Sequence, residues 1–85
     1  MILVVSPQAR KQIKKLPSNI QKKTKKQFYL LLSNYRHPSL RTSKMSSKNT
    51  YEARIDLHYR FRFMIEEDKV YILTAGMHDF GLGKK

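Results

Sequence analysis

The chain has 85 residues, and its 18 lysine and arginine residues against six aspartate and glutamate residues give a formal net charge of +12. This length predicts a single domain over residues 1–85 with one modest core, which excludes a two-domain enzyme with an interdomain cleft. The chain has no cysteine, which excludes disulfides and thiolate metal sites, and its three histidines lack the spacing of zinc ligands. We therefore expect neither a metal nor another cofactor.

The positive charge is concentrated in one half of the chain. Residues 1–48 hold twelve basic residues and no acidic one, whereas residues 49–85 are formally neutral. An excess of this size indicates a nucleic acid, an anionic membrane surface or an acidic protein as partner. No apolar run approaches the length of a signal-peptide core or a membrane span, so we expect a cytoplasmic protein.

The first elements along the chain are a strand and two helices. Residues 2–5 are apolar and β-branched, which predicts a buried strand. Ser6 and Pro7 then supply a helix N-cap and a first helical residue, and an apolar stripe continues until Pro17. A second helix is predicted over residues 19–35. These two helices form an antiparallel hairpin.

The remaining residues predict strands. A weak strand over residues 40–45 precedes two segments of strict alternation, residues 51–57 and 59–65, and an apolar strand over residues 70–75 follows an acidic turn. The class is therefore α+β: an N-terminal strand, a helical hairpin, and a three- to four-stranded antiparallel sheet with the helices packed on one face. The alternation assigns these ionisable residues to the open face: Glu52, Arg54, Asp56, Arg60 and Arg62.

Four lysines, Lys22, Lys23, Lys25 and Lys26, lie on the solvated side of the second helix. A soluble helix surface is the ordinary interpretation of such a run. However, like charges four residues apart repel, and no glutamate offsets them. A polyanion or an acidic partner is therefore favoured as the reason for the run.

The arginines of the open face form a second candidate cluster. Cross-strand ion pairs with the two acidic residues account for part of it. They do not account for Arg54, Arg60 and Arg62 together, with Lys44 and Arg41 added from the weak strand. Guanidinium groups bind phosphate bidentately and stay charged, so the cluster favours the backbone of single-stranded RNA.

His78 follows the last predicted strand and can complete a catalytic group. RNA cleavage without a metal needs a base for the 2′-OH, cations for the charge on phosphate and an acid for the leaving 5′-oxygen. Glu52 or His78 can be the base, Arg54 and Arg60 the cations, and His78 the acid. A lone histidine is more often a structural residue, so this group has low specificity by itself.

In their order and spacing, these segments resemble the RelE/ParE superfamily of type II toxin–antitoxin toxins over nearly the whole chain. The resemblance lies in the first strand with Ser6-Pro7, the lysine-rich hairpin, His37-Pro38, Lys44-Met45, residues 51–55, residues 59–63 and residues 72–79. It implies a RelE-like fold and a toxin of the RelE/YoeB/YafQ branch. Such a toxin is an endoribonuclease that cleaves mRNA on the ribosome, inhibits translation and is held inactive by a cognate acidic antitoxin.

By position, the resemblance makes Arg60 the central catalytic arginine, Arg54 a phosphate contact and His78 the acid, and it places Lys44 near a basic patch. The chain departs from the family pattern at two places. Glu52 stands where a basic residue is common, and Phe80, which can stack on a base, lacks a hydroxyl group. These departures leave open a toxin with weakened cleavage.

Two other functions remain open from the sequence. A ParE-like poison of DNA gyrase has the same overall pattern, although the arginine and histidine residues favour the nuclease. A non-catalytic RNA-binding or ribosome-bound protein agrees equally well with the composition. A membrane-surface role ranks lowest, because the apolar stripe of the basic helix is needed for the core.

Overall fold

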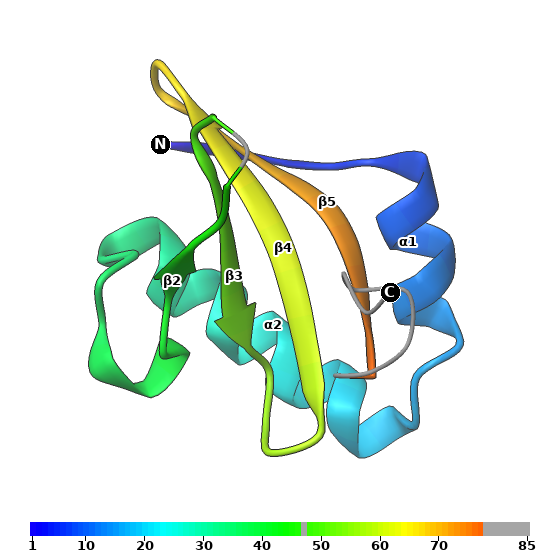
Figure 1. The fold of residues 1–85 in the computed structure, drawn as a ribbon. Helices are drawn as coiled ribbons and strands as arrows, with labels where there is room; N and C mark the ends of the chain where they lie inside the picture. The colour runs from blue at the N-terminus through cyan, green and yellow to red at the C-terminus, as the bar shows by residue number, and fades with distance from the viewer. Residues whose placement is uncertain (47, 78–85) are drawn as a thin grey trace.

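The computed structural model describes residues 1–46 and 48–77, and its elements follow the predicted order (Figure 1). They are β1 (Ile2–Val5), α1 (Pro7–Lys14), α2 (Ser18–Ser33), the 3-10 helix η1 (Pro38–Leu40), β2 (Ser43–Lys44), β3 (Thr50–Arg54), β4 (Tyr59–Glu66) and β5 (Lys69–Met77). The predicted α+β class is confirmed. No helix in the described part of the chain is long and apolar enough to cross a membrane.

All five strands form one mixed sheet in the order β1-β5-β4-β3-β2. The strands β2 to β5 are antiparallel, as predicted, and β1 adds to β5 in parallel. The prediction that residues 2–5 are buried is wrong, since β1 is an edge strand and Ile2 is 53% exposed. Local hydrophobicity indicates a strand, but only the tertiary fold determines how many neighbours that strand has.

Beyond the end of β1, side chains of the first helix bind the edge of β5. The Ser6 hydroxyl accepts a hydrogen bond from the Ala9 amide at 3.0 Å, which makes it the predicted N-cap, and donates to the carbonyl of Leu73 at 3.1 Å. The Gln12 side-chain oxygen accepts from the Ala75 amide at 2.8 Å. These bonds satisfy backbone groups that no strand pairs on this side.

The core lies between the helices and the sheet face predicted for it. Figure 1 shows α2 crossing behind β3 and β4, with α1 beside β5. Phe61 and Phe63 are fully buried, and Phe28 meets Phe61 edge to face with ring centroids 5.2 Å apart. In this turn of α2 Gln27 is buried, with 6% exposure, whereas Phe28 is only partly buried.

The predicted strand over residues 40–45 is shorter than expected. Pro38 to Leu40 form η1, which fully buries the Leu40 side chain, and only Ser43 and Lys44 pair with β3. Arg41 has a left-handed backbone (φ 49°, ψ 46°) that ends η1. The chain therefore enters β2 three residues later than the apolar pattern suggests.

Candidate nucleic-acid site

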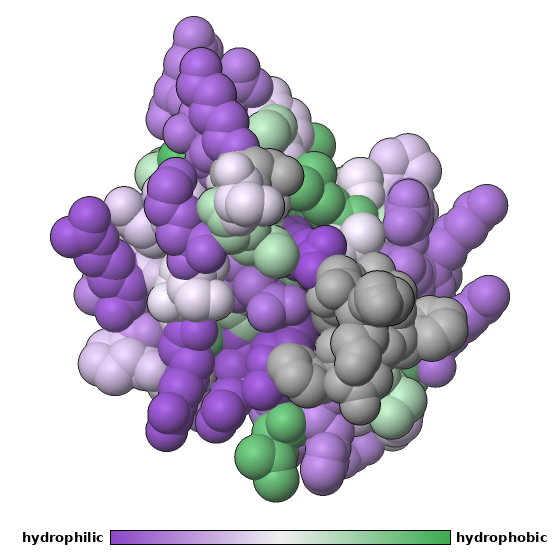
Figure 2. Space-filling view, in the orientation of Figure 1, coloured by the Kyte–Doolittle hydropathy of each residue, from purple (hydrophilic) through white to green (hydrophobic). Residues whose placement is uncertain are grey.

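The antiparallel register of β3 and β4 brings the predicted arginines together on the open face of the sheet. Arg54 lies directly opposite Arg60, and Glu52 lies directly opposite Arg62. Like charges directly opposite each other destabilise a sheet, so the Arg54–Arg60 pair has a cost in stability. Figure 2 shows hydrophilic side chains gathered over β3 and β4 on this face. The register thus places together four of the five ionisable residues that the alternation assigned to this face.

Arg60 is held by the carbonyl oxygens of its own hairpin. Its Nη1 atom lies 2.9 Å from the carbonyl oxygen of Asp56, and 3.2 Å from those of Leu57 and Tyr59. A guanidinium group has five N–H donors in a rigid plane, so fixing Nη1 also fixes the direction of the other donors. Within the described residues Arg60 makes no ion pair. Its charge is therefore oriented but not neutralised.

Arg62 and Glu52 form an ion pair across the two strands, with 3.8 Å between Nε and Oε2. Both side chains are about four-fifths buried, at 21% and 20% exposure. The buried Nε atoms of Arg54 and Arg62 have no hydrogen-bond partner among the described residues. Buried donors of this kind are rare in folded proteins. The Arg62 Nε atom faces the Glu52 carboxylate beyond hydrogen-bond distance, and neither Nε atom is open to solvent.

Asp56 does not lie among the arginines of the open face. It follows β3 in the hairpin loop, where its carboxylate accepts from the His58 amide at 2.9 Å and meets Lys23 of α2 at 3.6 Å. Partial burial is the largest single influence and raises the pKa of Asp56, but the His58 amide, the Lys23 charge and the Tyr59 amide together outweigh it. The net result is a pKa below the ordinary value of an aspartate.

Lys44 and Arg41 do not join the arginine cluster, contrary to the prediction. Lys44 pairs with Tyr51, whose side chain is on the core face, and only Ser43 shares the side of Glu52. Because successive residues of a strand point to opposite faces, Lys44 lies on the helix side of the sheet. Its ammonium group sits 5.3 Å from the centroid of the Tyr51 ring.

The four lysines of α2 are exposed, as predicted, and Lys23 is the one that pairs with Asp56. The predicted acid His78 and the predicted stacking residue Phe80 lie outside the described residues. Within residues 1–46 and 48–77, no three histidine, aspartate or glutamate side chains gather closely enough to hold a metal ion.

The structure adds site residues that the sequence did not indicate. Gln27 donates from Nε2 to the carbonyl oxygen of Arg54 at 2.8 Å, so α2 supports the end of β3. Tyr35 and Arg36 come close to Lys44 and Tyr51 on the helix side. In the sequence, Gln27 could be noticed only as a polar residue at the spacing of the core residues of α2. No local pattern marks Tyr35 and Arg36 as site residues.

Two helices packed on one face of a mixed sheet, with arginines on the other face, define a class of small basic protein. Comparison with solved structures shows that toxins described as YoeB/ParE, YafQ and RelE share this fold. A YoeB/ParE toxin from Agrobacterium tumefaciens superimposes with a TM-score of 0.79 at 10% identity, over 92% of this chain and 99% of that one. YafQ from E. coli gives 0.78 at 15% identity, over 95% and 97%. The isolated E. coli RelE toxin gives 0.74 at 21% identity, over 89% and 82%.

Related folds also occur in the crystal structures of the DinJ–YafQ, RelBE and YoeB–YefM toxin–antitoxin complexes. No protein-family model matches the sequence, and no curated protein matches it either. The predicted RelE-like fold is thus confirmed by structural similarity and not by sequence similarity.

Proposed function

We propose that this chain is an endoribonuclease toxin of a toxin–antitoxin pair, which cleaves mRNA and so inhibits translation. The observation that carries the proposal is the cross-strand pair of Arg54 and Arg60, which no carboxylate among the described residues neutralises. It lies on the open face of a fold shared with RelE, YafQ and YoeB toxins. Two adjacent guanidinium groups, of which Arg60 is held in orientation by its hairpin carbonyls, are suited to a phosphodiester.

In the proposed reaction the 2′-oxygen of a ribose attacks the adjacent phosphorus. The bond between the 2′-oxygen and phosphorus forms while the bond from phosphorus to the 5′-oxygen breaks, leaving a cyclic 2′,3′-phosphate and a 5′-hydroxyl. Glu52 or His78 accepts the proton of the 2′-OH, and His78 donates a proton to the departing 5′-oxygen. Every atom and proton is then accounted for by the chain and the RNA.

Arg60 and Arg54 stabilise the charge that develops on the phosphate oxygens. The hairpin carbonyls occupy only Nη1 of Arg60, so Nε and Nη2 are the donors for a bidentate phosphate contact. A donor whose orientation is set before the substrate binds needs no rearrangement during the reaction. We therefore assign Arg60 the central role and Arg54 the second phosphate contact, with Arg62 positioning Glu52.

The proposed partners are ribosome-bound mRNA and an acidic antitoxin protein. The exposed lysines of α2 and the net charge of +12 suit both, since each partner is anionic. The matched toxin–antitoxin complexes support the second partner.

Expression in a bacterium tests the function. Wild-type protein is expected to arrest growth and to cut mRNA within minutes, whereas Arg60→Ala and His78→Gln are expected to do neither. Growth arrest with DNA breaks and intact mRNA would instead favour a gyrase poison. RNA binding that is unaffected by His78→Gln, without cleavage by the wild type, would favour a non-catalytic RNA-binding protein.

A further inference from the structure

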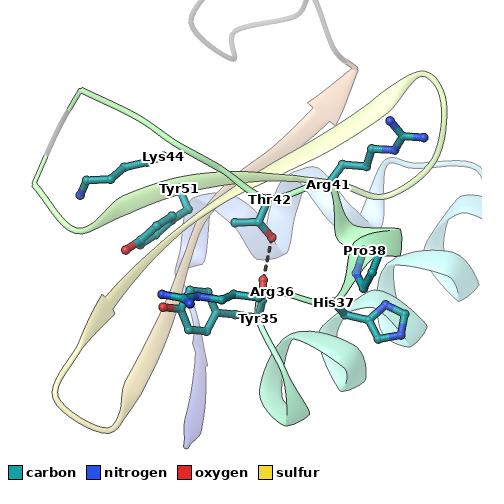
Figure 3. Close-up of a pocket in the computed structure, with 8 residues that line it drawn as sticks. All are labelled: Tyr35, Arg36, His37, Pro38, Arg41, Thr42, Lys44 and Tyr51. Atoms are coloured by element: carbon teal, nitrogen blue, oxygen red, sulfur yellow. Dashed lines mark hydrogen bonds between the residues drawn. The ribbon is translucent and has the colours of Figure 1, made fainter.

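A cavity of about 420 Å³ lies on the helix side of the sheet, at the edge formed by β2 and β3. Its walls come from the residues after α2, from η1 and from the two strands (Figure 3). The open-face arginines take no part in it, because Lys44 and Tyr51 of the cavity pair with each other on the face opposite to Glu52. It is therefore a separate feature from the Arg54–Arg60 site.

Two cation–aromatic pairs form one side of the cavity. The Arg36 guanidinium carbon lies 5.5 Å from the centroid of the Tyr35 ring, and the Lys44 ammonium lies 5.3 Å from that of Tyr51. The two rings are 5.8 Å apart at an angle of 62°. Figure 3 shows both cations and both phenol hydroxyls on the same side of the cavity, while Arg41 points away from it.

These groups share one chemical property, which is that each can donate a hydrogen bond to an anion. No aspartate or glutamate lines the cavity, and neither Arg36 nor Lys44 makes an ion pair in the described part of the chain. Guanidinium, ammonium and phenol donors together match the several oxygens of a phosphate group. The tyrosine rings are themselves packed, since Tyr51 stacks on Phe63 and Lys44 lies over it, so the tyrosines offer their hydroxyl groups and not a free stacking face. The anion with several oxygens that the proposed function supplies is the phosphate of an RNA backbone.

We propose that this cavity is a second contact site for single-stranded RNA, in which Arg36 and Lys44 bind a backbone phosphate beside the two tyrosines. The identity of the ligand rests on the proposed nuclease function. The strand order puts β2 at the edge of the sheet, and β2 is only two residues long. A flexible strand that leaves the Arg54–Arg60 site can therefore pass around this edge to reach the cavity. The site holds the RNA and does not take part in its cleavage.

The test measures binding separately from cleavage. The probe is a 2′-O-methyl RNA decamer labelled with fluorescein at its 3′ end, which cannot be cut by 2′-OH attack, and binding is followed by fluorescence anisotropy between 50 and 300 mM salt. The test variant is Arg36→Gln with Lys44→Gln. The matched control removes two exposed charges from α1 with Lys11→Gln and Lys14→Gln. Both variants replace exposed side chains, and thermal melting checks that each is folded.

Loss of two phosphate contacts should weaken binding about tenfold at moderate salt and reduce the slope of log affinity against log salt by about 1.4. The control should change affinity less than about twofold. A charge-preserving variant, Arg36→Lys with Lys44→Arg, should keep most of the affinity. Equal weakening by test and control variants, or no weakening by the test variant, would overturn the proposal.

Competitors distinguish the possible sources of the anion. Unlabelled RNA should displace the probe at far lower concentration than uridine monophosphate or inorganic phosphate does. If uridine monophosphate displaces the probe as well as RNA does at the same concentration of phosphate groups, the cavity binds a free nucleotide and the proposed RNA contact is overturned. Displacement by polyglutamate as efficient as by RNA would assign it to an acidic peptide instead.

Cleavage of unmodified mRNA by the same proteins separates this inference from the proposed function. If the wild type cuts mRNA and the test variant binds the probe like the wild type, the inference fails and the function stands. If the wild type binds the probe through Arg36 and Lys44 but never cuts mRNA, the function fails and the RNA contact stands.

Discussion

Gln27, buried in the middle of α2, donates its Nε2 hydrogen to the main-chain carbonyl oxygen of Arg54 at 2.8 Å. The same nitrogen lies 3.3 Å from the carbonyl of Ser39. A single side chain thus joins the lysine-rich helix, the segment after it and the last residue of β3. Through this contact the core supports the position of a candidate phosphate-binding residue on the opposite face of the sheet.

Replacing Gln27 with alanine should destabilise the protein and weaken the site. The Arg54 carbonyl would lose its partner in a buried setting, which costs about 1–3 kcal/mol of unfolding free energy. Urea denaturation measures this loss, and mRNA cleavage should fall because the end of β3 is less well positioned. Gln8→Ala, at an exposed position of α1, is the control and should leave both quantities unchanged. If Gln27→Ala changed neither stability nor cleavage, water would be replacing the hydrogen bond to the Arg54 carbonyl.

Arg60→Ala should reduce the rate of mRNA cleavage by about 100- to 1000-fold, the range for loss of one preorganised donor in an active site. Arg60→Lys should also lose most activity, because an ammonium group retains the charge but lacks the planar donor pair. Single-turnover cleavage of a defined mRNA measures both. Arg10→Ala on α1 is the control. Full activity of Arg60→Lys would mean that the charge alone suffices and that the fixed orientation of the guanidinium is unimportant.

If Glu52 and Arg62 stabilise the protein through their ion pair, the effects of replacing each residue on the free energy of unfolding should not be additive. Because both side chains are largely buried, the cycle of Glu52→Gln, Arg62→Gln and the double variant should give an interaction energy of about 1 kcal/mol in unfolding free energy. If Glu52 is the base, cleavage should fall far more in Glu52→Gln than in Arg62→Gln. Strict additivity of the stabilities would mean that the pair contributes nothing.

Asp56 should make stability depend on pH in the acidic range. Its pKa is lower in the folded than in the unfolded chain, so the carboxylate stabilises the fold above the unfolded value of about 3.9, and this contribution is lost as pH falls through the folded value. Asp56→Asn should therefore lower the free energy of unfolding by about 1 kcal/mol at pH 7 and by almost nothing near pH 2. Chemical denaturation at several pH values measures the difference. Asp68→Asn, in the exposed turn, should show little difference at either pH.

Much of the fold follows from local patterns in the sequence. The alternation in residues 51–57 and 59–65 predicted which side chains of β3 and β4 are buried, because a strand has a side-chain period of two. It was wrong for Leu57, which lies in the loop after β3 and is 66% exposed. Ser6 and Pro7 marked the start of α1 for reasons that act within one turn. These features need no knowledge of distant residues, and they were sufficient to place Glu52, Arg54, Arg60 and Arg62 on one face.

The tertiary structure decided the features that depend on partners far apart in sequence. The parallel pairing of β1 with β5 joins residues 67 positions apart, and no local pattern encodes it. The side taken by Lys44 depends on where β2 begins, since a shift of one residue turns every side chain of a strand to the other face. The binding of Arg60 to its hairpin carbonyls and of Asp56 to Lys23 follows from loop geometry. The sequence by itself determined the class of fold and the chemistry of the open face. The packing of α2 and β2 against that sheet separated one predicted basic surface into an arginine site and a tyrosine-lined cavity, because side-chain direction is set only when strands pair.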